Sequence, residues 1–132
     1  MESPSGSFED IVAFIGEFSH DPLGFVYATF PWGKDGTELA SMDGPDEWQK
    51  EILADIGRGV KDLSSVTREA VASGHGIGKS ALVAWIILWS LATHEDTRCV
   101  VTANTDTQLR SKTWAELAKW YRLFIGRDMF CF

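Results

Sequence analysis

Eight consecutive residues near the middle of the chain have the types and spacing of a phosphate-binding loop: Ser73-Gly74-His75-Gly76-Ile77-Gly78-Lys79-Ser80. Three glycines within five positions let the backbone wrap closely around an anion. Lys79 supplies a positive charge for the outer phosphates and for the charge that develops on them in a transition state, and the Ser80 hydroxyl is a ligand for Mg²⁺. Ser73 stands where the usual pattern has its first glycine, so a glycine-rich turn remains the alternative.

Such a loop needs a strand before it and a helix after it. Residues 68–72 are short and partly apolar, which predicts a buried strand, and residues 81–92 are mostly apolar, which predicts a helix over 79–93. In that order, the loop amides and the positive end of the helix dipole point at one phosphate group.

The remaining elements are expected to alternate between helix and strand. Helices are predicted from Ser7 to the Asp21-Pro22 pair, from Pro45 to about Leu63, and from Thr105 to about Phe124. The aromatic stretch 25–33 is expected to be extended, 34–44 to be a loop, 97–102 to be a second strand, and 129–132 to start a third. This order predicts an α/β fold with parallel crossovers.

The pair Trp48-Gln49 could select the base of a nucleotide. A glutamine amide has one acceptor and two donors, so it can bind both N6 and N7 of adenine. The alternative is a polar residue on the surface of a helix.

Composition and charge limit the classes of protein to which this chain can belong. The chain has 132 residues, is 45% hydrophobic and has a net charge of −7. The first 66 residues hold four Lys or Arg against thirteen Asp or Glu, and the remaining 66 hold eight against six. Any DNA contact is therefore expected to be local, in the second half. The beginning of the chain has no signal-peptide pattern, and the apolar run 81–92 is shorter than the roughly 20 residues of a membrane span, so we expect a cytoplasmic protein.

The cysteines and histidines give no sign of a metal or disulfide site. Cys99 and Cys131 have no paired spacing and are read as reduced core residues. His20, His75 and His94 form no ligand cluster in the sequence.

Together, these motifs resemble the N-terminal ATPase part of the large subunit of tailed-phage terminases, the motors that package DNA. The resemblance covers most of the chain. It rests on Asp21-Pro22-Leu23-Gly24-Phe25-Val26, Phe30-Pro31-Trp32-Gly33, Trp48-Gln49, the loop Gly74-His75-Gly76-Ile77-Gly78-Lys79-Ser80, Thr102-Ala103-Asn104-Thr105, Gln108 and Trp114.

The resemblance implies the incomplete front half of a P-loop NTPase (RecA/ASCE-like) domain, a parallel sheet with flanking helices. Residues 1–44 would be an N-terminal helix and aromatic leader, and 45–132 the front part of the ATPase domain, with no nuclease domain. ATP and Mg²⁺ are the implied cofactors. Gln49 would read adenine with Trp48 nearby, the amides of 74–79 would hold the β-phosphate, and Ser80 would ligate Mg²⁺.

The implied partners are double-stranded DNA, the portal and the small terminase subunit, and no membrane is implied. The implied location is the cytoplasm of a bacterial host, and a homo-oligomer is possible. The implied task is the ATP-driven packaging of viral DNA into the prohead. Arg110 and Lys112 are candidate DNA contacts, with a solvated helix face as the alternative.

An acidic element for hydrolysis is not evident. An apolar strand ending in two acidic residues would hold Mg²⁺ and polarise water, and the nearest pair, Glu95-Asp96, follows the helix of the loop instead. We therefore expect a truncated chain that binds ATP and hydrolyses it weakly or not at all. The alternatives are a non-enzymatic nucleotide-binding or interaction remnant and a helicase-type ATPase with the same loop.

Overall fold

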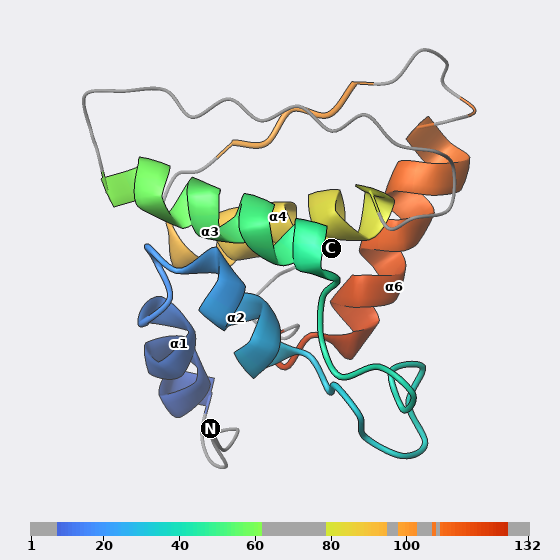
Figure 1. Ribbon diagram of the computed structural model, residues 1–132, viewed down its shortest axis with the longest axis horizontal. Coiled ribbons are helices and arrows are strands. Elements are labelled where there is room, and N and C mark those ends of the chain that lie inside the picture. Colours follow the sequence, from blue (N-terminus) through green and yellow to red (C-terminus); the bar gives the residue numbers. More distant parts are fainter. Residues whose placement is uncertain (1–7, 62–78, 95–97, 103–106, 108, 127–132) are drawn as a thin grey trace.

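Helices dominate the part of the chain that the computed structural model describes, which is residues 8–61, 79–94, 98–102, 107 and 109–126. In chain order they are α1 (Phe8–Gly16), α2 (Pro22–Thr29), α3 (Glu47–Lys61), α4 (Lys79–Thr93), the π-helix η1 (Leu109–Trp114) and α6 (Ala115–Leu123). α4 packs against α1, α2, η1 and α6, whereas α3 packs against α2. Figure 1 shows α1 and α2 (blue) at one end of the molecule and η1 and α6 (orange to red) at the other.

The expected α/β fold, a P-loop NTPase parallel sheet with flanking helices, is wrong for this structure. The described residues contain helices and turns and no strand. Residues 98–102 of the predicted second strand have neither strand nor helix geometry, and Val100 is 88% exposed. A strand is stable only when a neighbour takes its hydrogen bonds and covers one face, and the described part provides no such neighbour. The other two predicted strands, 68–72 and 129–132, lie outside the described residues.

The extended structure predicted for 25–33 is also wrong over its first half, because α2 covers Pro22–Thr29. Asp21 caps this helix: its Oδ1 accepts a hydrogen bond from the backbone N–H of Gly24 at 2.9 Å. Pro22 occupies the first turn, where its fixed φ favours a helix and its missing N–H costs nothing. The pair Asp21-Pro22 therefore starts a helix, although it was expected only to end the one before it.

Two of the predicted helices are confirmed closely. α3 and α4 match the predictions for 45–63 and 79–93, and the apolar side chains of α3 (Trp48, Ile52, Leu53, Ile56 and Val60) face the core as their spacing predicted. α3 lies so close to the start of α2 that a Cβ on Gly57 would be 3.2 Å from the His20 carbonyl oxygen and from Pro22 Cδ. Glycine at this position thus permits the α2–α3 contact.

The helices meet around a cluster of aromatic rings. Trp85 of α4 packs edge to face with Trp120 of α6 at 5.1 Å between ring centroids, and Trp32 lies 5.8 Å from Trp85. Phe30 joins the cluster 5.1 Å from Trp120. Each buried ring of this kind stabilises the fold by about 1.5–3 kcal/mol through burial alone. Packing between helices takes the place of the expected packing of helices on a sheet.

The connection between α2 and α3 is the loop predicted for 34–44. Gly33 and Gly36 adopt positive φ angles of 69° and 83°, a region that favours glycine. Leu39 anchors the loop in the core, and the Trp32 indole N–H donates to the Val26 carbonyl oxygen at 2.8 Å. None of the described helices combines the length and apolar character that crossing a membrane requires.

Candidate functional site

Lys79 and Ser80 are the first two residues of α4. Both are partly buried at the N-terminal end of the described helix. The first turn of α4 contains no acidic residue that would neutralise the positive end of its dipole. The other predicted residues of the loop, Gly74, His75, Gly76, Ile77 and Gly78, lie outside the described residues.

Buried side chains along α4, and one hydrogen bond near its C-terminal end, fix the position of the helix in the core. Seven side chains of the helix are buried, on more than one side: Ala81, Leu82, Ala84, Trp85, Ile87, Leu88 and Trp89. The Trp89 indole N–H donates to the Phe18 carbonyl oxygen at 2.7 Å, which ties the far end of α4 to the residues after α1. Packing of these side chains in the core therefore determines where the first turn of α4 lies.

Gln49 has a structural task in this fold. Its Oε1 accepts the backbone N–H of Asp46 at 2.8 Å, as the third helical residue does in a capping box, and the side chain is only 4% exposed. Trp48 is partly buried and packs against the core. Because the Gln49 side chain is buried and its oxygen already accepts the Asp46 N–H, the role of Gln49 and Trp48 at a base stays a prediction.

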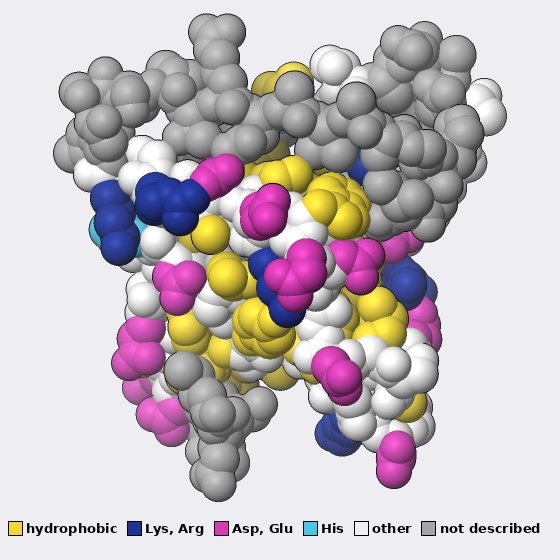
Figure 2. Space-filling view, in the orientation of Figure 1, with side chains coloured by type: hydrophobic (Ala, Val, Ile, Leu, Met, Phe, Trp, Pro, Cys, Tyr) yellow, Lys and Arg dark blue, Asp and Glu magenta, His cyan; other side chains and the backbone are white. Residues whose placement is uncertain are grey.

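Arg110 and Lys112, the candidate DNA contacts, are both exposed on η1. They lie at the start of a helical stretch that includes α6. Between positions 107 and 126 the sequence has four basic residues, Arg110, Lys112, Lys119 and Arg122, and one acidic residue, Glu116. Figure 2 shows acidic side chains spread over the face it presents, so the basic character of η1 and α6 stands against an acidic background.

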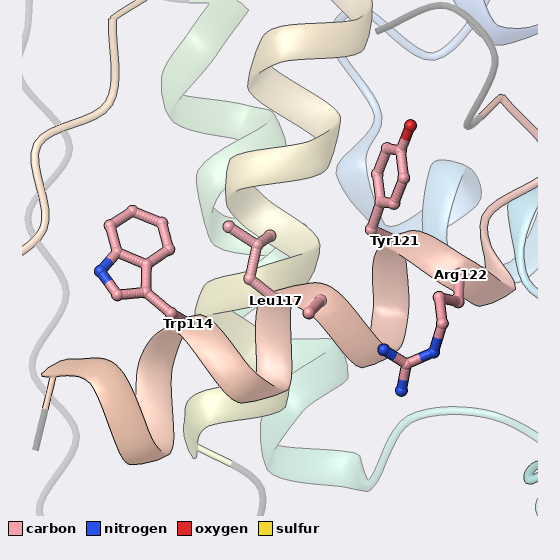
Figure 3. A pocket seen from close by; sticks show the side chains of 5 residues that line it. Trp114, Leu117, Tyr121 and Arg122 are labelled. Carbon is pink, nitrogen blue, oxygen red and sulfur yellow. The ribbon is translucent and has the colours of Figure 1, made fainter. Parts of the chain in front are cut away.

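Sequence reasoning missed an apolar groove on η1 and α6. It has a volume of about 450 Å³, and the described residues that line it are Trp114, Leu117, Ala118, Tyr121 and Arg122. Figure 3 shows the Trp114 and Tyr121 rings rising from the same side of the helix with Leu117 between them. The signal was present in the spacing of 114, 117, 118, 121 and 122, which follows one helical face. Trp114 is 45% exposed.

Among the residues that the structure describes, two ionisable groups have shifted pKa values. The Lys50 ammonium donates to the Glu47 carboxylate at 3.1 Å, and this contact, with a weaker one to Tyr27, raises the pKa of Lys50. Cys99 was predicted to lie in the core but is exposed, and partial desolvation by the surrounding protein raises the pKa of its thiol. Neither group lies in α4, and among the described residues no three His, Cys, Asp or Glu side chains gather to hold a metal ion. The acidic pair Glu95-Asp96 lies outside the described residues.

Comparison of the chain with protein-family models, with curated proteins and with solved structures gave no match.

Proposed function

We propose that this chain binds the phosphates of ATP, with Mg²⁺, at the N-terminus of α4. The observation that carries the proposal is the position of the last two motif residues: Lys79 and Ser80 are the first described residues of α4. The N-terminus of a helix, with its N–H groups and the positive end of its dipole, favours a phosphate group. The proposal requires a loop and a helix, and it does not depend on a parallel sheet.

The chemistry assigns one task to each residue type. Backbone amides of 74–79 would surround the β-phosphate, and the Lys79 ammonium would neutralise oxygens of the β- and γ-phosphates. The Ser80 hydroxyl would be a ligand of Mg²⁺, which itself bridges two phosphates.

The resemblance to terminase large subunits places this binding in a DNA-packaging motor. On this proposal the chain contributes the nucleotide-binding part, in the cytoplasm of a bacterial host, and double-stranded DNA, the portal and the small subunit are partners of the motor. We expect phosphate release by the chain to remain at the level of a Lys79→Ala variant, because the sequence contains no apolar strand that ends in two acidic residues.

A titration of the chain with ATP and Mg²⁺ by isothermal calorimetry tests the proposal. Lys79→Ala should weaken binding about tenfold or more, since a charge-assisted contact contributes about 1.5–3 kcal/mol. Lys61→Ala removes an exposed lysine from the last turn of α3 and serves as the matched control. Equal affinity of the two variants, or no binding at millimolar ATP, would contradict the proposal.

Selection of adenine can be tested without disturbing the cap. Gln49→Glu keeps an oxygen that can accept the Asp46 N–H, but it removes the amide donor that would reach adenine N7. If Gln49 reads the base, this variant loses a preference for ATP over GTP under conditions in which circular dichroism shows it folded; the buried carboxylate is expected to lower its unfolding midpoint. An unchanged ratio of ATP to GTP affinity would leave Gln49 with the capping role alone.

A further inference from the structure

We draw no further inference here: the strongest candidate, the apolar groove on η1 and α6 lined by Trp114, Leu117, Ala118 and Tyr121, carries none because nothing in the part of the chain that the structure describes shows what covers it.

Discussion

Individual residues in this chain have roles that their type alone does not reveal. Gln49 and Asp21 both sit at helix starts and use side-chain oxygens to bind backbone N–H groups, at 2.8 Å and 2.9 Å. In the sequence, Gln49 suggested a contact to a base, and Asp21 suggested the end of a helix. Asp21 immediately precedes α2 and Gln49 is the third residue of α3, and polar side chains at both positions commonly cap a helix.

The Asp21 cap and Gly24 depend on each other. A Cβ on Gly24 would lie 2.2 Å from Asp21 Oδ2, so Gly24→Ala must displace the carboxylate and break the cap. Losing a cap costs about 1 kcal/mol, and replacing glycine by alanine in a helix gains nearly as much. We therefore expect Gly24→Ala to change the free energy of unfolding little in the wild type but to stabilise an Asp21→Ala variant by up to about 1 kcal/mol. A double-mutant cycle in urea measures the coupling, and strict additivity would show that the two residues do not interact.

The Cys99 thiol should lose its proton at a higher pH in the folded chain than in the unfolded chain. Its pKa is raised by partial burial, so in the alkaline range the unfolded chain releases this proton before the folded chain does. The free energy of unfolding should thus fall as the pH rises through the ordinary pKa of a thiol toward the raised one. In a Cys131→Ser background, the rate of alkylation by iodoacetamide should rise at higher pH for the folded chain than for the chain in urea. Identical profiles would contradict the shift.

At the scale of elements, helix predictions succeeded where the apolar spacing was long and regular. The fifteen residues of α4 and the fifteen of α3 give several turns of consistent pattern, and both helices lie where the sequence places them. α2 has eight residues rich in aromatic and β-branched types, which favour strands when judged alone. The Asp21 cap and Pro22 favour a helix here. The Phe25 ring packs against Phe30 and Phe124 and not against a sheet.

The two buried tryptophans of α4 offer a matched comparison. Trp89 donates its indole N–H to the Phe18 carbonyl oxygen, whereas no acceptor among the described residues lies within hydrogen-bond distance of Trp85 Nε1. Trp→Phe removes a similar volume at both positions. At position 89 it also removes a hydrogen bond, whereas at position 85 it removes a buried donor that has no acceptor among the described residues. We expect Trp89→Phe to lower the free energy of unfolding by about 2 kcal/mol more than Trp85→Phe does. Urea unfolding followed by circular dichroism measures this difference, and equal losses would contradict it.

For the whole molecule, the sequence predicted single long helices better than the architecture. The helix over 79–93 was predicted correctly, because helix formation depends on residues close together in the chain. The sheet was inferred from short segments such as 98–102, whose pairing depends on partners far away in sequence, and the structure leaves Val100 on the surface. The Trp114–Tyr121 groove was missed because helical periodicity says which residues share a face but not which part of that face the core covers.

The central claim is that ATP binds at the start of α4, and backbone amide chemical shifts in a ¹⁵N-labelled chain test it most directly. Addition of ATP with Mg²⁺ should shift the amide signals of Lys79 and Ser80 most among those of the helices, and those of α6 little. A Lys79→Ala variant should lose these shifts at the same ATP concentration. The claim is contradicted if saturating ATP leaves the signals at the start of α4 unmoved, or if the largest changes fall on another element and persist in Lys79→Ala.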